Sequence, residues 1–367
     1  MSKERVLVAM SGGVDSSVAA AMLVEQGYDV IGATMKLFCH GTDVPDRPCC
    51  SLDSVNDARR VCEQLGIPHY VLNLESRFSH DVVDNFVEEY ARGRTPIPCV
   101  RCNTFTKFRD FLKKADGIDA RWIATGHYAR IVNGELHRGV DANKDQTYFL
   151  WGIDHAVLQR MLLPVGDLDK PRTRALAHAM GLEVIADKAE SQEICFVPDG
   201  DYMRILESRL PADAPALQPG PIMISNGAVI GEHRGFARYT VGQRRGVPGG
   251  FPHPMYVIAI RPETRAVVIG TRDELLGSGL IAREINWLGD RPSVGTQISV
   301  RVRHRASLAR AEIVRIGGDE LEIALDEPVA SITPGQSVVL YHGERVLGGG
   351  FIESSRARRT ALPVLAA

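Results

Sequence analysis

The stretch "RVLVAMSGGVDSS", residues 5–17, decides the fold because it joins a short apolar run to a glycine-rich turn and a helical pattern. Residues 5–10 are typical of a buried strand, and residues 16–26 of a helix that stops at Gly27. Gly12 and Gly13 let the backbone approach a ligand closely, and the first amide groups of a helix attract phosphate. The turn has neither GK[ST] nor GxGxxG, so it is not a Walker A loop or a dinucleotide fingerprint.

Outward from this turn, the first half of the chain alternates short apolar runs with helical patterns. The further predicted strands are 29–36, 69–74 and 121–126, and the further predicted helices are 53–65, 77–91 and 103–115. This order indicates a mainly parallel sheet with helices on both faces. Ligands of such sheets bind at the carboxyl ends of the strands, which is where the glycine-rich turn lies.

The second half has a different texture. Residues 211–222 are rich in Pro and Ala and are typical of a linker. Beyond them, short β-branched runs separated by Gly and Pro predict small β domains, barrel-like towards the end. The predicted fold class is therefore α/β: a doubly wound parallel sheet (1–205), a small β-rich central domain (206–275) and a C-terminal β-barrel that contacts nucleic acid (276–360).

Composition places the chain among globular proteins. It has 367 residues, of which 44% are hydrophobic and 24% charged. No apolar run approaches the roughly 18 residues that a membrane span needs, and the N-terminus lacks the pattern of a signal peptide. We therefore expect a cytoplasmic protein that does not engage membranes.

The seven cysteines all lie in the first 195 residues, at positions 39, 49, 50, 62, 99, 102 and 195. Cytoplasmic thiols stay reduced, so a structural disulfide framework is disfavoured, and patterned cysteines point to chemistry or metal binding. Cys49 and Cys50 are adjacent and receive no role, because neighbouring cysteines rarely bridge well.

Basic residues are distributed unevenly. Residues 201–367 hold 20 Arg and no Lys, against 17 acidic residues. Arg suits bidentate contact with phosphate, although a coding bias toward Arg explains the count equally well. Within this half, Arg301, Arg303 and Arg305 are expected on one face of a strand, a pattern that fits phosphate contact but is also common on solvated strands.

The hexapeptide SGGVDS resembles the PP-loop of ATP pyrophosphatases, which cleave ATP to AMP and pyrophosphate and activate a carbonyl oxygen by adenylation. The resemblance places Asp15 and Ser16 beside the pyrophosphate and its Mg²⁺, and Met35 near the adenine. The ATP-binding residues that it implies are Ala9, Met10, Ser11, Gly12, Gly13, Val14, Asp15, Ser16, Met35 and Gly126.

Further motifs extend along the whole chain and resemble one family, the tRNA-specific 2-thiouridylases. They are "TPIPCVRCNTFTKF" (95–108), "IATGHYARI" (123–131), "KDQTYFL" (144–150), "SQEICFVPDGDY" (191–202), "YTVGQRRG" (239–246) and "PGQSVVLY" (334–341). The resemblance implies an adenine nucleotide alpha hydrolase-like first domain. It also implies ATP-dependent adenylation of the 2-oxygen of a wobble uridine, followed by replacement of that oxygen with sulfur.

The implied partners are the tRNAs for Lys, Glu and Gln, together with a cysteine desulfurase or a sulfur-relay protein as sulfur donor. The implied tRNA contacts are Ile97, Pro98, Cys99, His127, Lys144, Asp145, Gln146, Arg303, His304 and Gln336. For residues 144–146 an exposed hairpin turn is the simpler interpretation. A lone His such as His127 is also more often a satisfied polar residue than a ligand contact.

Two cysteines receive chemical roles from the resemblance. Cys195 matches the residue that holds the persulfide, and Cys102 matches the nucleophile that attacks it or closes a disulfide with it after sulfur release. Cys102 directly precedes the predicted helix 103–115, whose positive dipole end would favour a thiolate. Without the motif, a cysteine among apolar neighbours such as Cys195 would be assigned to the core.

Cys99 departs from the family pattern, because many members have Asp at this position. Either the thiol substitutes for that acid/base group, or Cys99, Cys102 and Cys195 together hold an iron–sulfur cluster with one open iron. Zinc is the competing metal, but a structural zinc site needs four ligands and no fourth is apparent. The spacing permits both the persulfide route and the cluster route.

Two rival functions explain less of the sequence. A PP-loop ligase that does not use RNA leaves the patterned cysteines and the Arg-rich half unexplained. A protein that only binds RNA or metal has no use for SGGVDS. The sequence therefore predicts a tRNA-uridine 2-sulfurtransferase that uses ATP and Mg²⁺, with an iron–sulfur cluster as an open alternative.

Overall fold

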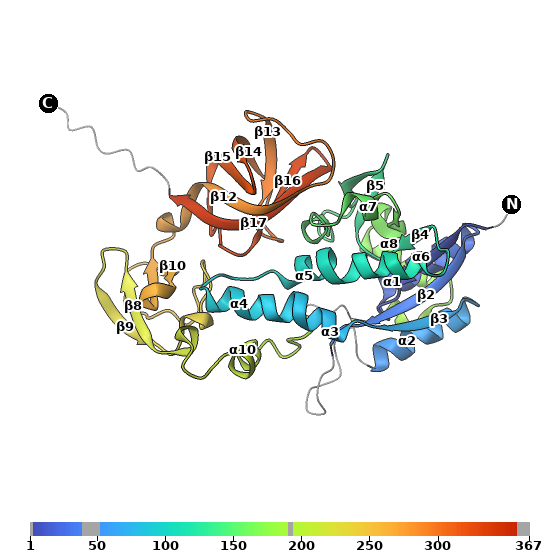
Figure 1. The fold of residues 1–367 in the computed structure, drawn as a ribbon, viewed down its shortest axis with the longest axis horizontal. Coiled ribbons are helices and arrows are strands. Elements are labelled where there is room, and N and C mark those ends of the chain that lie inside the picture. The colour runs from blue at the N-terminus through green and yellow to red at the C-terminus, as the bar shows by residue number, and fades with distance from the viewer. Residues whose placement is uncertain (1–2, 39–51, 190–193, 358–367) are drawn as a thin grey trace.

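The computed structural model describes residues 3–38, 52–189 and 194–357, so Cys39, Cys49 and Cys50 lie outside the described residues. Figure 1 shows three parts: an α/β part that holds the N-terminus, a small sheet at the opposite end, and a barrel above the helices between them. The predicted order of a parallel sheet, a small β domain and a C-terminal barrel is confirmed.

The first sheet has five strands in the order β3-β2-β1-β4-β7, and all of its pairings are parallel. The strands are β1 (Arg5–Ala9), β2 (Asp29–Lys36), β3 (His69–Asn73), β4 (Trp122–Ala124) and β7 (Met161–Leu162). Val6 and Val8 of β1 pack into one hydrophobic cluster and Leu7 into another, because successive side chains point to opposite faces. Both faces of the sheet are therefore buried, as expected for parallel strands.

Helices cover both faces of this sheet. The helices of the α/β part are α1 (Val14–Glu25), α2 (Leu52–Gln64), α3 (Glu75–Phe78), α4 (Asn85–Ala91), α5 (Pro98–Arg101), α6 (Phe108–Asp116), α7 (His155–Leu158), α8 (Lys170–Ala179) and α9 (Glu183–Ala186). Helices α1, α2, α8 and α9 pack with Val6 and Val8, whereas α6 packs with Leu7. The helix α1 begins directly after the glycine-rich turn, as the sequence predicts.

Two of the helical stretches contain π-helical segments, at Ser79–Asp84 between α3 and α4 and at Cys102–Lys107 between α5 and α6. The second stretch is therefore helical from Pro98 onward, and the prediction that a helix begins after Cys102 is wrong. The start moves because Pro98 is pre-set for the first turn of a helix. Cys99 lies in that first turn, and Cys102 opens the π-helical segment one turn later.

The central part is a four-stranded sheet in the order β10-β11-β8-β9, with α10 (Met203–Arg209) before it. Its strands are β8 (Gly220–Ile224), β9 (Val229–His233), β10 (Tyr256–Arg261) and β11 (Ala266–Gly270). Residues 211–222 do not form a simple linker, because Pro215–Leu217 is a 3₁₀ turn with Ala216 buried and β8 begins at Gly220. The Pro-rich segment is thus part of the packed core of this region.

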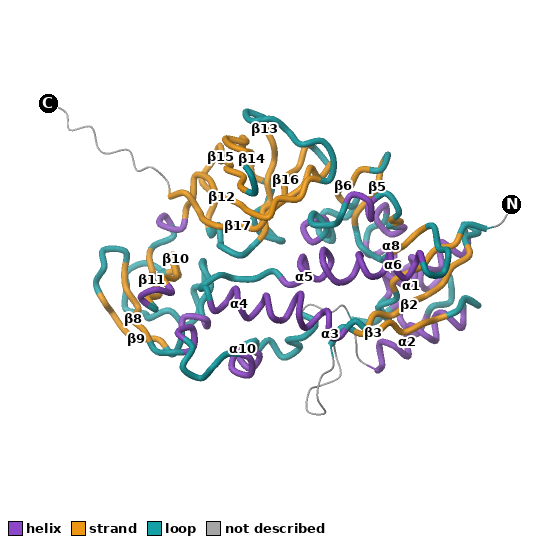
Figure 2. Tube along the Cα trace, viewed as in Figure 1, coloured by secondary structure: helices purple, strands orange, loops and turns teal. Residues whose placement is uncertain are grey.

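The last six strands close into a barrel, because β12 pairs with both β15 and β17. They are β12 (Leu276–Trp287), β13 (Gln297–Arg301), β14 (Ala309–Gly317), β15 (Glu320–Ala330), β16 (Ser337–His342) and β17 (Arg345–Ala357). The hairpin of β5 (Ala129–Val132) and β6 (Glu135–Arg138) reaches over from the first part, and His137 pairs with Arg345 of β17. Figure 2 shows these strands in orange beside the purple helices of the α/β part.

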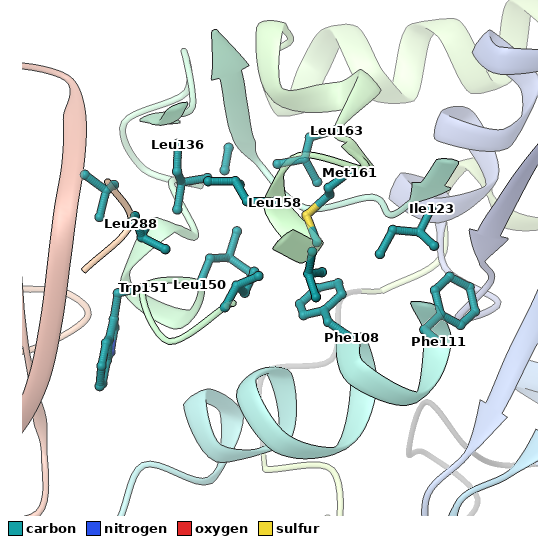
Figure 3. Packing of buried hydrophobic residues seen from close by; sticks show 14 of the residues in the cluster. Phe108, Phe111, Ile123, Leu136, Leu150, Trp151, Leu158, Met161, Leu163 and Leu288 are labelled. Carbon is teal, nitrogen blue, oxygen red and sulfur yellow. The ribbon is translucent and has the colours of Figure 1, made fainter. Parts of the chain in front are cut away.

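One hydrophobic cluster joins the α/β part to the barrel. Figure 3 shows Phe108 and Phe111 of α6 near Ile123, with Trp151 and Leu288 at the other end of the cluster. Trp151 donates a hydrogen bond to the Ser337 hydroxyl at 3.0 Å and packs edge-on against Phe351 of β17. The barrel is therefore fixed to the α/β part through a shared core. Among the described residues, no helix combines the length and apolarity that crossing a bilayer requires.

Candidate active site

A cavity of about 220 Å³ lies at the carboxyl ends of β1, β2 and β4. It is lined by Ala9, Met10, Ser11, Asp15, Ser16, Thr34, Met35, Leu37, Lys107, Phe108, Thr125, Gly126, His127 and Gln146. Seven of these residues are among those predicted to bind ATP, while Gly12, Gly13 and Val14 of the same loop lie outside the lining. The cavity occupies the sheet edge at which parallel α/β folds bind their ligands.

The backbone leaves no room for a side chain at Gly12, within the glycine-rich loop, or at Gly126, which packs against that loop. Gly12 has φ +71, and a Cβ atom there would lie 2.1 Å from the carbonyl oxygen of Ser54. A Cβ on Gly126 would lie 2.5 Å from the backbone nitrogen of Ser16. Both positions therefore require glycine. Within the loop, the Ser16 hydroxyl donates to the Gly13 carbonyl at 3.1 Å and accepts from the Ser11 amide at 3.2 Å.

Asp15 is held by two residues that the sequence analysis missed. Lys170 Nζ lies 2.7 and 3.0 Å from the two carboxylate oxygens of Asp15, and the Tyr128 hydroxyl donates to Oδ1 at 2.7 Å. Lys170 is the first residue of α8, and Asp169 caps that helix by accepting from the Arg172 amide. The sequence "DLDKPR" does show a helix cap, Asp169, followed by the basic residue Lys170. No sequence pattern near Lys170, however, indicates that it contacts Asp15.

A second cation supports the loop from the other side. Lys188 Nζ donates to the Gly12 carbonyl at 3.0 Å and pairs with Asp57 at 2.6 Å. Together with Lys107 in the lining, Lys170 and Lys188 bring three positive charges to this edge of the sheet. This charge complements the phosphates of a nucleotide. The carboxylate of Asp15 is a hard oxygen ligand at the cavity, which fits a Mg²⁺ ion that is shared with phosphate.

His127 and Gln146 were expected at the tRNA, yet both line the cavity. The Nδ1 atom of His127 lies 2.7 Å from the Thr125 hydroxyl, and Gln146 accepts from the Tyr128 amide at 2.9 Å. Burial, with a smaller effect from Lys107, lowers the pKa of His127 to about 3. The ring is therefore neutral near pH 7 and can donate or accept one hydrogen bond without adding charge.

Asp145, which the resemblance assigns to a tRNA contact, is not the exposed turn residue of the simpler interpretation. Its carboxylate is buried, pairs with Arg301 at 2.9 Å and accepts from the Thr147 hydroxyl at 2.8 Å. Arg138 approaches the same carboxylate at 3.4 Å. Because Asp145 neighbours Gln146, this ion pair links the barrel strand β13 to the wall of the cavity. Lys144, its other neighbour, is only half-buried.

The predicted arginine stripe is wrong. Strand β13 ends at Arg301, which points inward to Asp145, so Arg303 and Arg305 follow in a turn. Arg303 donates to the Val241 carbonyl at 2.8 Å and to the Thr333 hydroxyl at 2.9 Å, and His304 lies against Phe149. Arg305 is exposed. The alternation rule fails because the strand ends at Arg301, four residues before the end of the predicted stripe at Arg305.

The segment before Cys99 is anchored to the barrel. Gln336 donates to the carbonyls of Thr95 and Pro96 at 3.0 and 3.1 Å, while Ile97 and Pro98 are buried. Cys99 itself is exposed. Whether these residues touch tRNA stays a prediction, and the geometry leaves Cys99 as the side chain of this segment that faces solvent.

Cys102 and Cys195 contribute to one hydrophobic cluster. Cys102 is buried in it, and the half-buried Cys195 packs against it, next to Phe196. Phe196 meets Phe78 and Phe86 in edge-to-face contacts. Cys102 also lies five residues before Lys107 on the same helical stretch, which corresponds to roughly 7 Å along the axis. Cys102 is thus on the same helical stretch as Lys107 and Phe108 of the cavity lining.

An iron–sulfur cluster does not fit this arrangement. Among the residues that the structure describes, no three His, Cys, Asp or Glu side chains converge as a metal site requires. Cys99 is exposed, whereas Cys102 is buried within the aromatic cluster. The thiols of Cys99, Cys102 and Cys195 are therefore not arranged as three ligands of one cluster, and no step below involves one.

Comparison with known proteins assigns the family. Family models match residues 4–199 (tRNA methyl transferase HUP domain), 212–271 (tRNA methyl transferase PRC-barrel domain) and 277–352 (aminomethyltransferase beta-barrel domain). A tRNA-specific 2-thiouridylase MnmA of Carboxydothermus hydrogenoformans is 47% identical, with 96% of this chain and 98% of that relative covered. The protein of the same name from Rhodospirillum centenum is 47% identical, over 99% and 94% of the two chains.

Solved structures resemble the chain only weakly. A 4-thiouridine synthetase–RNA complex with bound ATP aligns with 57% of this chain and 51% of that chain at 20% identity and a TM-score of 0.35, a likeness too low to support an argument. The full-length similarity to curated relatives is decisive by itself: the chain belongs to the tRNA-specific 2-thiouridylase family.

Proposed function

We propose that this protein converts the wobble uridine of tRNA to 2-thiouridine in an ATP-dependent reaction that releases AMP and pyrophosphate. The main support is one juxtaposition: the cavity at the glycine-rich loop is lined by Lys107 and Phe108, and Cys102 lies roughly 7 Å away along the same helical stretch. Carbonyl activation and sulfur delivery thus have neighbouring sites. The names of the relatives agree with this reaction.

In the first step, the 2-oxygen of the uridine attacks the α-phosphorus of ATP, and pyrophosphate leaves. Activation is needed because a urea-like carbonyl is a poor electrophile, whereas AMP is a good leaving group. We propose that the loop amides, Lys170 and Lys188 bind the phosphates and that Asp15 would hold Mg²⁺, an interpretation supported by the contacts of Lys170 with Asp15 and of Lys188 with Gly12. When bound, Mg²⁺ supplies neutralisation of the phosphate charge. The neutral His127 is placed to orient a polar group by hydrogen bonding.

In the second step, sulfur replaces the adenylated oxygen. We propose that Cys195 carries a persulfide and that the Cys102 thiolate attacks its inner sulfur. A disulfide between Cys102 and Cys195 forms, hydrosulfide leaves, and hydrosulfide then displaces AMP from C2 of the base. An external thiol must reduce the disulfide before the next turnover. The shared apolar cluster favours this route, because it brings Cys102 and Cys195 into one environment from which water is largely excluded.

The proposal assigns the exposed Cys99 to the acid/base role that many relatives give to Asp. It also retains the remaining expected contacts: Lys144, Gln146, Arg303, His304 and Gln336 at the tRNA. The proposed partners are the tRNAs for Lys, Glu and Gln and a cysteine desulfurase or relay protein, which would place the protein in the cytoplasm. The domain boundaries 1–205, 206–275 and 276–360 are proposed as functional units.

The test measures AMP, pyrophosphate and 2-thiouridine together, using purified protein with a cysteine desulfurase, cysteine, a thiol reductant and Mg²⁺–ATP. The substrate is a glutamate tRNA, and the matched control is the same tRNA with cytidine at the wobble position. We expect AMP and 2-thiouridine in equal amounts with uridine and neither with cytidine. ATP cleavage that does not depend on the wobble base would overturn the proposal.

A further inference from the structure

The short segment that contains Cys99 and Cys102 is attached to the barrel on both sides. Upstream, Arg94 pairs with Glu353 of β17, and the Thr95 amide donates to the Pro334 carbonyl at 2.9 Å. Gln336 adds the two hydrogen bonds to Thr95 and Pro96 described above. These contacts come from regions more than 200 residues away in the sequence, so they fix where the segment begins relative to the barrel.

Within the segment, a second attachment is made by Arg101, which lies between the two cysteines. Its Nη2 atom donates to Glu284 Oε1 of β12 at 2.9 Å. Its guanidinium carbon also lies 4.5 Å from the centre of the Phe351 ring of β17 and 5.2 Å from that of Phe105. Arg101 is thus held by an ion pair and by cation–π contacts at the same time, and its side chain is only 17% exposed.

The barrel adopts an unusual backbone conformation where it meets Arg101. Glu284 has φ +52, a left-handed value that is uncommon for a residue with a side chain, and it lies where the register of β12 against β17 shifts between Arg283 and Asn286. Such bulges redirect side chains, and backbone strain persists where surrounding contacts hold it. Here the redirected carboxylate meets the guanidinium of Arg101.

The segment has a specific need for this support. Cys102 opens a π-helical segment, in which the backbone hydrogen bonding of an α-helix is interrupted. The orientation of the two cysteines relative to α6 and the nucleotide cavity is therefore set less firmly by the helix itself. An external contact at position 101 supplies the missing restraint.

We propose that Arg101 is a positioning residue for the Cys99–Cys102 turn, and that Glu284 and Phe351 make the barrel part of the sulfur-transfer machinery. This inference rests on the proposed function. It predicts that loosening Arg101 separates the two half-reactions: adenylation continues, while sulfur reaches the activated base less often and water hydrolyses the adenylate.

The test uses the full-length protein with Arg101→Met, which keeps the aliphatic bulk near Phe351 and removes the charge, and with Glu284→Gln, which removes only the charge of the partner. The measured quantity is 2-thiouridine formed per AMP released. We expect it to fall roughly 10- to 100-fold in Arg101→Met, because small misplacements of reacting groups cost about that much. Arg101→Lys, which retains the charge, should recover part of the loss.

The matched control is Glu320→Gln, which removes the charge that pairs with Arg283 at the same bulge and with Arg315 of β14. We expect the ratio of 2-thiouridine to AMP to stay unchanged in this control. If Arg101 only stabilised the region in general, the ratio would fall in both variants alike. A ratio in Arg101→Met within twofold of the parent, or an equal fall in the control, would overturn the proposal.

A second readout does not depend on the reaction. Without RNA, the rate of iodoacetamide alkylation of each cysteine is followed by peptide mass spectrometry. We expect Arg101→Met to raise the rate at the buried Cys102 roughly tenfold and to change that at the exposed Cys99 little, because access limits thiol reactivity. Unchanged alkylation of Cys102 would count against positioning. Absence of 2-thiouridine in the parent protein would instead refute the proposed function.

Discussion

The nucleotide cavity and the cysteine region are built in different ways. The cavity is formed by residues at the ends of adjacent strands, so the sheet core fixes them, and ion pairs from α8 and the 188 region complete it. The cysteine region combines one turn that is anchored to the barrel with Cys195, which packs from a separate segment. The proposed activation site therefore depends on the sheet, whereas the proposed sulfur site depends on contacts between distant parts of the chain.

The largest expected effect tests whether sulfur transfer can be abolished while the binding of ATP and tRNA is retained. Replacing Cys195 with Ser removes the proposed persulfide, so 2-thiouridine should become undetectable while ATP and tRNA still bind with affinities close to those of the parent. Product analysis and binding titration measure the two properties. Cys62→Ala is the control, because Cys62 of α2 is buried against Gly32 of β2 and has no role in the proposed reaction. Thiolation by Cys195→Ser would contradict the sulfur-carrier role.

The reverse experiment removes the activation site alone. Asp15→Asn weakens the contact with Lys170 and removes the proposed Mg²⁺ ligand, so the rate of AMP formation should fall by roughly 10²–10³. A persulfide should still load onto Cys195, which mass spectrometry after incubation with the desulfurase would detect. Glu25→Gln, at the exposed far end of α1, is the matched control and should be silent. Loss of persulfide loading in Asp15→Asn would show that the two sites are not independent.

An intermediate effect concerns the link between the barrel and the cavity. Asp145→Asn leaves Arg301 buried without a full counter-charge, so the free energy of unfolding should drop by about 3 kcal/mol or more. Urea denaturation monitored by tryptophan fluorescence measures it. Glu344→Gln weakens the more exposed pair with Arg138 and should cost less than about 1 kcal/mol. Equal losses in both variants would remove the distinction between the buried and the exposed pair.

The smallest expected effect distinguishes the roles of Arg303 and Arg305, the two arginines that follow β13. Arg305 is exposed, so Arg305→Ala should weaken tRNA binding a few-fold and lower the slope of log affinity against log salt by about one. Arg303 is tied to Val241 and Thr333, so Arg303→Ala should also loosen the junction with the central part. Affinity measurements at several salt concentrations would decide, and an unchanged slope for Arg305→Ala would mean that this turn does not meet phosphate.

The parts of the molecule that could be predicted are those with local signals. The first strand, the glycine-rich turn and α1 follow from hydrophobic pattern and helix-start chemistry within a dozen or so residues. Lys170 could not be found in this way, because its partner Asp15 is 155 residues away and only the packing of α8 on α1 brings them together. The same reason hid the burial of Arg301 against Asp145.

The start of the helix that contains Cys102 differs from the prediction for another reason. Pattern analysis assumes a constant 3.6 residues per turn, and the stretch from Pro98 to Asp116 does not keep that period. Its π-helical segment moves the apolar positions out of phase, so the pattern predicts a helix only over residues 103–115. The first turn could still have been recognised from Pro98 itself, which favours the first position of a helix.

This π-helical segment also bears on how the chain can vary in length. A π turn holds one more residue than an α turn, and each residue of an α-helix advances the side-chain direction by about 100°. Because the extra residue is taken up within the π turn, deleting one residue within Cys102–Lys107 would restore a regular α-helix and leave the bearing of Cys99 relative to Phe108 nearly unchanged. The chain can therefore lose one residue here without turning Cys99 away from α6, whereas a deletion in the regular part of α6 would rotate the side chains on either side of it by about 100°.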